Sequence, residues 1–198
     1  CLAIKPKNIS FEEATAAAYG GLLALQYLEK GDIEPGQKVL VYGASGTSGT
    51  TAIQLAKHFG AEVTGVCGTK NLELIKSLGA DKILDYTDRD SLAKLESYDF
   101  ILDSVGKRRT SELKEACKNA LRQNGKYVSI DDGALELNSE RLNKIRELIE
   151  SGEVKPITDK CYPFEQMVEA HRYVELGHKK GNVAITVNQK ISTIALSG

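Results

Sequence analysis

Three glycines between residues 43 and 49 are spaced so that they could hold a phosphate group. Gly43, Gly46 and Gly49 follow an apolar run and precede a helix-like stretch in the pattern G-x-x-G-x-x-G. Residues without a Cβ let the backbone approach a pyrophosphate, and the next helix points free N–H groups and its positive dipole end at the anion. Hydroxyl donors in the same turn belong to Ser45, Thr47 and Ser48. A turn without a ligand would also use these glycines, but the strand-turn-helix setting favours phosphate binding.

Two other phosphate-binding classes need residues that this sequence lacks. A P-loop requires GxxxxGK[ST], and no lysine follows Gly49. A short-chain reductase requires a Tyr-x-x-x-Lys pair, in which the lysine lowers the pKa of the phenol so that the tyrosine can act as an acid. None of the eight tyrosines has a lysine four residues later. NTPases and short-chain reductases are therefore both disfavoured.

The residues after the second apolar run indicate which dinucleotide would be bound. An NAD site places Asp or Glu there, about 20 residues beyond the glycine turn, to bind the ribose 2′-hydroxyl. The stretch here reads VCGTKN from Val66 to Asn71, with no acid and with a base, Lys70. A carboxylate would repel a 2′-phosphate, whereas an ammonium group and hydroxyls would bind it. Lys70 could also be a solvated lysine at a helix start, but the pattern favours NADP(H) over NAD(H).

Composition and charge disfavour several kinds of partner. The net charge of −1 offers no attraction to nucleic acid or to an anionic membrane surface. The longest apolar stretch, Ala14 to Leu28, is too short for a membrane span. The sequence contains no CxxC or HExxH pattern, so we expect no metal site within it. Its four cysteines stand alone, which suits a reducing compartment and predicts a cytoplasmic protein.

The elements that must position the glycine turn alternate along the chain. A capping box, Ser10 with Glu13, precedes an alanine-rich run. Helices are expected at residues 11–19, 21–29, 50–59, 71–78, 110–121, 139–151 and 164–176. Strands are expected at residues 39–42, 62–66, 82–84, 98–103, 126–130 and 182–187, the last of which would complete the sheet. Apolar strands joined by helices predict an α/β fold of the Rossmann type, doubly wound, with a mostly parallel sheet and helices on both faces.

Longer stretches of the sequence resemble the medium-chain dehydrogenase/reductase superfamily, and within it the zinc-free quinone oxidoreductase branch. The resemblance rests on KPKNISFEEATAAAYGGLLALQYL, residues 36–87, YDFILDSVGK, LRQNGKYVSI and the segment from LIESG to VAITV. These stretches follow the family order almost end to end. The resemblance implies an NADPH-dependent oxidoreductase that reduces quinones, enones or related carbonyls by hydride transfer from the nicotinamide. It also implies a small-molecule substrate and a homodimer.

The resemblance further implies which residues would surround NADP(H). The pyrophosphate would be held by Ala44, Ser45, Gly46, Thr47, Ser48 and Gly49. The 2′-phosphate and adenosine would be surrounded by Gly68, Thr69, Lys70, Asn71 and Tyr86. The ribose and nicotinamide would lie near Val105, Gly106, Ser129, Ile130 and Asp131. No residue of the chain is assigned a catalytic role, and Asp103 is interpreted as a strand-end residue held by backbone amides.

The chain departs from the family pattern in three places. GTSG replaces the usual GGVG in the turn, and the stretch after YVSIDDG is shorter than in most members. Members also carry a GroES-like, β-rich domain before this point, which supplies most of the substrate pocket. We therefore expect residues 1–188 to be an NADP-binding Rossmann domain that is inactive alone. Within it, residues 1–35 would be a helical bridge from the missing domain, and residues 189–198 would form a tail.

Two other functions fit the same residues. One is an NADP(H)-binding sensor or scaffold domain without catalysis, which the lack of a substrate-binding domain favours. The other is part of a zinc-type alcohol dehydrogenase, which would need Cys and His ligands upstream. An upstream β-rich domain would exclude the sensor or scaffold, and metal analysis of the full-length protein would test the zinc enzyme.

Overall fold

Helices and strands alternate along most of the chain in this computed structural model, which describes residues 1–108 and 110–187. The strands are β1 (Lys38–Tyr42), β2 (Glu62–Cys67), β3 (Lys82–Asp85), β4 (Tyr98–Asp103), β5 (Leu121–Ser129), β6 (Thr158–Pro163) and β7 (Asn182–Thr186). The α-helices are α1 (Phe11–Glu29), α2 (Gly49–His58), α3 (Leu72–Ser77), α4 (Glu112–Asn119), α5 (Ser139–Glu150) and α6 (Met167–Glu175). Short 3-10 helices are η1 (Thr69–Asn71), η2 (Arg89–Lys94), η3 (Gly106–Arg108) and η4 (Phe164–Gln166).

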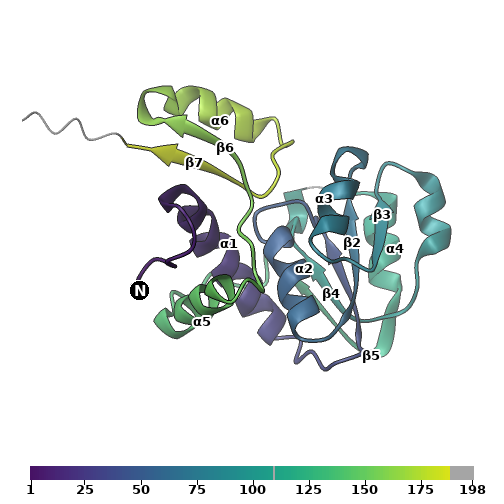
Figure 1. Ribbon diagram of the computed structural model, residues 1–198. Helices are drawn as coiled ribbons and strands as arrows, with labels where there is room; N and C mark the ends of the chain where they lie inside the picture. Colours follow the sequence, from purple (N-terminus) through teal and green to yellow (C-terminus); the bar gives the residue numbers. More distant parts are fainter. Residues whose placement is uncertain (109, 188–198) are drawn as a thin grey trace, which may run out of the picture.

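Five strands form one parallel sheet in the order β3-β2-β1-β4-β5 (Figure 1). The first strand, β1, is central and pairs with β2 on one side and β4 on the other. Because all five strands run parallel, their carboxyl ends meet at one edge of the sheet. In doubly wound folds, ligands bind at this edge, where the strand order reverses. The predicted Rossmann-type fold is confirmed.

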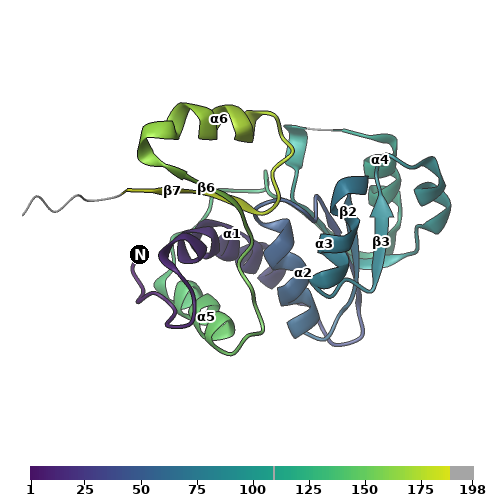
Figure 2. The same ribbon diagram turned by 45° about the horizontal axis from the view of Figure 1, so that its top comes forward.

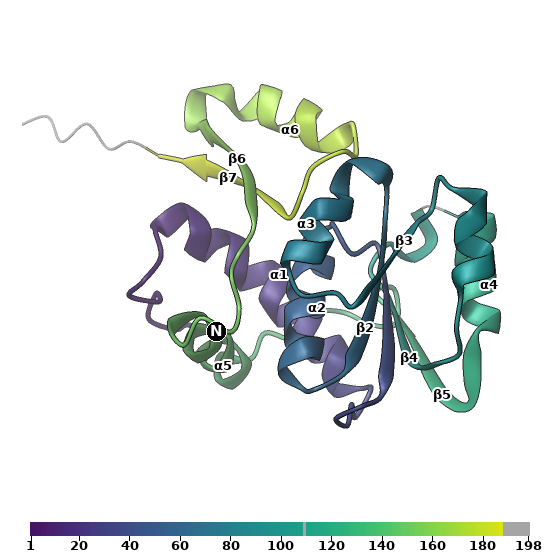
Figure 3. The same ribbon diagram turned by 45° about the vertical axis from the view of Figure 1, so that its right-hand side comes forward.

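Alternate residues of β1 enter two separate cores. Val39 and Val41 pack in a core that includes residues of α1, α2 and α5, whereas Leu40 and Tyr42 pack in a core that includes residues of α4. Figure 3 shows α2 and α3 on one side of the sheet and α4 on the other. Side chains of a strand alternate between faces, so the unbroken apolar run of β1 is what a strand covered on both faces requires.

The first helix is longer than the sequence predicted. The Ser10–Glu13 capping box is present, with the Glu13 amide donating to Ser10 Oγ at 3.2 Å and the Ser10 amide donating to Glu13 Oε2 at 2.9 Å. The expected break at Gly20 and Gly21 is wrong, because α1 continues through both. A Cβ added at Gly20 would lie 2.5 Å from the carbonyl oxygen of Thr47. This glycine therefore allows α1 to pack against the glycine turn and does not end the helix.

The last strand does not complete the five-stranded sheet, which corrects the sequence prediction. β7 pairs in parallel with β6 in a separate two-stranded sheet, with α6 as the connection between them. β6 was not predicted because its sequence, TDKCYP, lacks the apolar alternation typical of a strand. In the structure none of its side chains is fully buried. In Figure 2, α6, the β6–β7 pair, α1 and α5 lie one above another. The segment from β6 to β7 thus covers α1.

One strand begins at a different residue than the sequence predicted. β5 begins five residues earlier than expected, at Leu121, because its polar RQNG stretch carries no strand pattern. Within the described residues, no helix is long and apolar enough to cross a membrane. The expected tail, residues 189–198, lies outside the described part of the chain.

Burial divides the four cysteines into two pairs with different expected reactivity. Cys67 and Cys117 are buried, and burial raises the pKa of each thiol to about 12. Cys1 and Cys161 are exposed. Since the thiolate is the reactive form, we expect two fast-reacting thiols in the native protein with Ellman's reagent at pH 8 and four after unfolding in urea. Cys161→Ser should lower the fast count to one. Four fast thiols in the native protein would contradict this placement.

Candidate functional site

The glycine turn joins the central strand β1 to α2. Gly43 has a φ of +80°, in the left-handed region that favours glycine. The amides of Gly43 and Ala44 donate to the carbonyl of Val66 in β2 at 3.0 and 2.9 Å, which ties the turn to the neighbouring strand. A Cβ added at Gly49 would lie 2.8 Å from the backbone of Ala44 and closer still to the Gly43 carbonyl oxygen. Glycine at position 49 therefore lets α2 begin directly against the turn.

The start of α2 presents unused hydrogen-bond donors. Ser48 precedes the helix in a helical backbone conformation, and its side chain makes no capping hydrogen bond. The amides of Thr47, Ser48 and Gly49 donate to no carbonyl or side chain within the described residues. These N–H groups and the positive end of the helix dipole are available to an anion.

The residues after β2 lie beside the glycine turn. Asn71 Nδ2 donates to Ser45 Oγ at 3.1 Å, which joins the two loops, and Asn71 Oδ1 is buried without a partner among the residues described. Tyr86, at the end of β3, packs over Gly68, where an added Cβ would lie 3.2 Å from the phenol oxygen. Lys70 is exposed and has no ion-pair partner within residues 1–108 and 110–187. The predicted residues for the 2′-phosphate are thus brought together around the end of β2.

The loop after β4 packs onto the glycine turn from the other side. A Cβ added at Gly43 would lie 2.5 Å from Val105 Cγ2. The amides of Val105 and Gly106 donate to Asp103 Oδ1 at 3.0 and 3.1 Å. Gly106 has a φ of +64°, so the loop turns sharply at that residue. Backbone amides hold Asp103 Oδ1, as expected from the sequence, whereas Oδ2 pairs with Lys114 and Tyr127.

The loop after β5 is connected to the loop after β4. The Ile130 amide donates to the Asp103 carbonyl at 3.0 Å, and Asp131 Oδ2 accepts from the Lys107 amide at 2.5 Å. On its other side, the Ile130 carbonyl accepts from Tyr27 Oη of α1 at 2.9 Å. The predicted nicotinamide residues from β4 and β5 therefore lie together. They stand at the same edge of the sheet as the glycine turn, because both strands end there.

Two family models described as zinc-binding dehydrogenase match the chain, one over residues 49–150 and the other over residues 133–185. The chain belongs to the zinc-binding dehydrogenase family. The resemblance to medium-chain dehydrogenases and reductases is thereby confirmed, and much of the site described above lies in the part that the first family model covers.

The relatives of this zinc-binding dehydrogenase chain include a reductase and an oxidoreductase. The 2-methylene-furan-3-one reductase of Solanum lycopersicum is 37% identical, over 93% of this chain and 49% of that protein. The chloroplastic NADPH-dependent alkenal/one oxidoreductase of Arabidopsis thaliana is 32% identical, with the same coverage of 93% and 49%. The chain therefore spans about half the length of these curated relatives.

Solved structures of similar proteins agree in fold. An NAD-dependent alcohol dehydrogenase is 30% identical with a TM-score of 0.82, over 94% of this chain and 62% of that chain. The quinone oxidoreductase of Coxiella burnetii has a TM-score of 0.78, over 94% of this chain and 64% of that chain. At 24% identity, the second similarity supports the fold alone.

The family is described by zinc binding, whereas the sequence predicts no metal site in this chain. Within residues 1–108 and 110–187, no group of three or more His, Cys, Asp or Glu side chains is placed to hold a metal ion. The histidines and cysteines of the chain are dispersed over separate elements. The expectation about metal stays a prediction.

Sequence reasoning missed one cation beside the glycine turn in this dehydrogenase family member. Lys179, between α6 and β7, donates to Thr47 Oγ1 and to the Gly181 carbonyl, both at 2.6 Å. The Gly181 amide donates to the Ser45 carbonyl at 2.8 Å, which fixes this loop on the turn. Burial lowers the pKa of Lys179, although the charge of Asp159 acts in the opposite direction. The segment GHKKG gave no sign of this contact, because it lies far from the turn in sequence and looks like a solvated loop.

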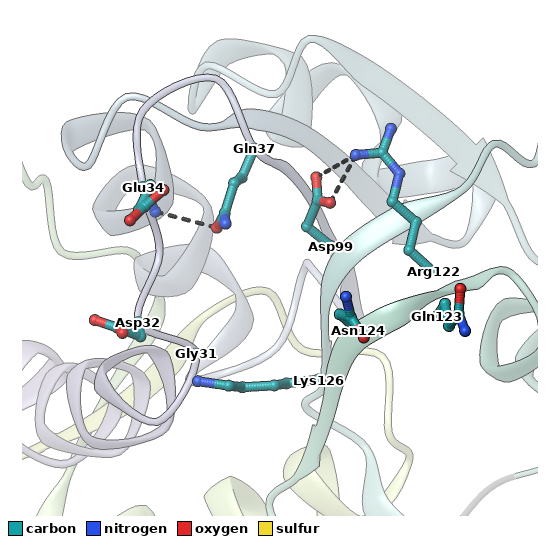
Figure 4. Close-up of a pocket in the computed structure, with 10 residues that line it drawn as sticks. Gly31, Asp32, Glu34, Gln37, Asp99, Arg122, Gln123, Asn124 and Lys126 are labelled. Carbon is teal, nitrogen blue, oxygen red and sulfur yellow. Dashed lines mark hydrogen bonds and ion pairs between the residues drawn. The ribbon is translucent and has the colours of Figure 1, made fainter.

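A cavity of about 450 Å³ lies at the amino ends of the strands (Figure 4). Its wall includes Asp99 of β4 and Arg122 of β5, whose hydrogen bonds measure 2.6 and 2.8 Å. Asp99 also accepts from the Lys38 amide at 2.8 Å. Asp99 is already hydrogen-bonded to a cation and an amide, so this cavity has fewer free hydrogen-bonding groups for a ligand. The opposite edge of the sheet, where amides are unused, is the better candidate site.

Proposed function

We propose that this chain is the cofactor-binding part of an NAD(P)H-dependent oxidoreductase, with NADP(H) favoured over NAD(H). One observation carries the proposal: unused amides at the start of α2 stand beside a β2 end that has Lys70 and no acid. An anion at the amides and a phosphate near Lys70 are what the pyrophosphate and 2′-phosphate of NADP(H) provide. Relatives named as an NADPH-dependent oxidoreductase and a reductase support the same reaction class.

The shape and polarity of the site fit a dinucleotide. Glycine at position 49 lets α2 begin directly against Gly43 and Ala44, which brings the unused amides of the helix start up to the turn. The unpaired, buried Oδ1 of Asn71 is an acceptor that a ribose hydroxyl could satisfy. Lys179 adds a half-buried cation on the side of the turn at Thr47, where the charge of a pyrophosphate would be stabilised.

Each part of the chain then has a defined role. The amides of the turn and Lys179 would bind the pyrophosphate, and residues 68–71 with Tyr86 would bind the adenosine ribose and its phosphate. Val105, Gly106 and residues 129–131 would orient the nicotinamide and exclude water from it. When bound, the nicotinamide supplies a hydride for an electrophilic carbon of the substrate. We assign no catalytic residue in this chain.

The substrate class is proposed to be quinones, enones or related carbonyls. Names of relatives support it, since one is a 2-methylene-furan-3-one reductase and another an alkenal/one oxidoreductase. Three expectations from the sequence stay predictions beside it: the single cofactor-binding domain over residues 1–188, the cytoplasmic location and the homodimer. β5 is an edge strand of the sheet, at which a second copy could pair, and sedimentation velocity would test the dimer.

Lys70→Met tests the choice of cofactor. We expect the wild-type chain to bind NADPH more tightly than NADH in a calorimetric titration. The variant should bind NADPH about tenfold more weakly, because it loses a charge-assisted hydrogen bond to the 2′-phosphate, whereas NADH affinity should not change. Lys76→Met, at an exposed position in α3, makes the same change in net charge and is the matched control.

Each outcome of these titrations bears on a separate part of the proposal. If neither NADPH nor NADH binds the wild-type chain, the cofactor-binding function is wrong. Tighter binding of NADH than of NADPH would overturn the preference for NADP(H). Equal losses in Lys70→Met and Lys76→Met would remove Lys70 from the site and leave only an effect of overall charge.

A further inference from the structure

Asp85 lies next to the proposed 2′-phosphate site, at the carboxyl end of β3. In the parallel register, Asp85 is opposite Cys67, the last residue of β2. Its carboxylate accepts a hydrogen bond from the hydroxyl of Thr69, in the first turn of η1. It also accepts from the amide of Thr87 at 2.9 Å and from the hydroxyl of Thr87 at 2.7 Å. A carboxylate on the neighbouring strand therefore approaches the β2 end, although β2 itself has no acid there.

The direction of these hydrogen bonds is fixed by the charge of Asp85. An ionised carboxylate can only accept, and each threonine hydroxyl has one hydrogen. Thr69 Oγ1 and Thr87 Oγ1 lie 2.5 and 2.7 Å from Asp85 but 3.1 Å from each other, so both hydroxyl hydrogens point at Asp85. Burial favours the neutral carboxyl, but the hydrogen bonds from Thr69 and Thr87 outweigh it and lower the pKa of Asp85. Thr69 therefore turns its oxygen lone pairs, and not its hydrogen, toward a ligand at the β2 end.

An oxygen that can only accept distinguishes the two cofactors. The 2′-phosphate of NADP(H) offers acceptors and negative charge, whereas the 2′-hydroxyl of NAD(H) can donate to Thr69 Oγ1. We propose that Asp85 is a specificity-determining residue that limits the preference for NADP(H) and keeps the ribose site open to NAD(H). Lys70 and Asp85 thus act in opposite directions on the same phosphate. This inference rests on the proposed function of the chain as a binder of NAD(P)H.

Asp85→Asn reverses the hydrogen bond without changing the shape of the side chain. The amide nitrogen of the new asparagine would donate to Thr69 Oγ1, which frees the threonine hydrogen for a phosphate, while its amide oxygen still accepts from Thr87. The variant also removes a negative charge beside the phosphate. We expect NADPH to bind about 3- to 10-fold more tightly and NADH to bind equally or less tightly, by calorimetric titration of the chain. Adenosine 2′,5′-bisphosphate and AMP should show the same difference.

Asp88→Asn is the matched control, because Asp88 lies in the same loop and is exposed. Asp88 Oδ1 accepts from the Asp90 amide at the start of η2, a cap that asparagine can also provide. This variant has the same charge change but does not touch Thr69. If Asp88→Asn and Asp85→Asn change NADPH affinity equally, the effect is one of overall charge and the inference is wrong.

Thr69→Val gives a second test, which remains valid if the Asp85→Asn variant does not fold. If Thr69 accepts from a ribose hydroxyl, the valine variant should lose more affinity for NADH than for NADPH. A larger loss for NADPH would mean that Thr69 donates to the phosphate, which overturns the inference. Failure of the proposed function looks different, since the wild-type chain would then bind neither dinucleotide. Dinucleotide binding with an unchanged NADPH-to-NADH ratio in Asp85→Asn refutes only the role of Asp85.

Discussion

Alanine at position 49 should destabilise the chain by about 3 kcal/mol or more and remove NADPH binding. The added Cβ would lie 2.8 Å from the backbone of Ala44 and closer to the Gly43 carbonyl oxygen. Both neighbours are main-chain atoms of a turn that is hydrogen-bonded to β2, so neither can rotate away as a side chain would. The start of α2 would have to move, and with it the amides that are proposed to bind the pyrophosphate.

Urea denaturation measures the stability change, and NADPH titration measures the loss of binding. Gly46→Ala is the matched control, since only the Gly43 carbonyl oxygen, at 3.3 Å, lies within 4 Å of a Cβ at position 46 among the described residues. The free energy of unfolding of that variant should lie within about 1 kcal/mol of the wild-type value. Its methyl group would touch the Gly43 carbonyl oxygen on the turn itself and should still weaken NADPH binding. A normal unfolding midpoint for Gly49→Ala would contradict this packing.

The glycine turn could be predicted from sequence because its physical causes are local. A strand, three glycines and a helix follow one another within residues 39–58, and each constrains its neighbours. The same local reasoning went wrong at Gly20, where a glycine allows helix packing against Thr47 and does not break the helix. Whether a glycine ends a helix or lets another segment approach depends on what lies beside it, and a single sequence does not state that.

Contacts between distant segments could not be predicted from the sequence for a related reason. Lys179 and Thr47 are far apart in the chain, and the pairing of β6 with β7 decides where Lys179 lies. The hydrogen bond from Thr69 to Asp85 forms because β2 and β3 are neighbouring strands in a fixed register. The sequence has no acid directly after β2, but a carboxylate from the next strand reaches the same place. Sequence spacing along one strand is therefore an incomplete guide to cofactor preference.

A buried ion pair behind the loop after β4 should carry the second large effect. Lys114 of α4 lies 2.8 Å from Asp103 Oδ2 at the end of β4, and their side chains are only 5% and 3% exposed. Lys114 also donates to the Gly106 carbonyl, and Tyr127 donates to Asp103 at 2.8 Å. Burial and the hydrogen bond to Asp103 raise the pKa of Tyr127, so it remains a donor at neutral pH. The pair thus holds the loop that contains Val105.

Lys114→Met should destabilise the chain by about 3–5 kcal/mol, because it leaves a buried carboxylate without its cation. Lys118→Met on the same helix is the matched control: its ion pair with Glu115 is exposed, and its loss should cost at most about 0.5 kcal/mol. The double variant Asp103→Asn with Lys114→Met should recover most of the loss in urea denaturation. The amide oxygen of the substituted asparagine would still accept from the amides of the loop, while no charge would be left buried. If the free energy of unfolding of Lys114→Met lies within about 1 kcal/mol of the wild-type value, the loop does not depend on this pair.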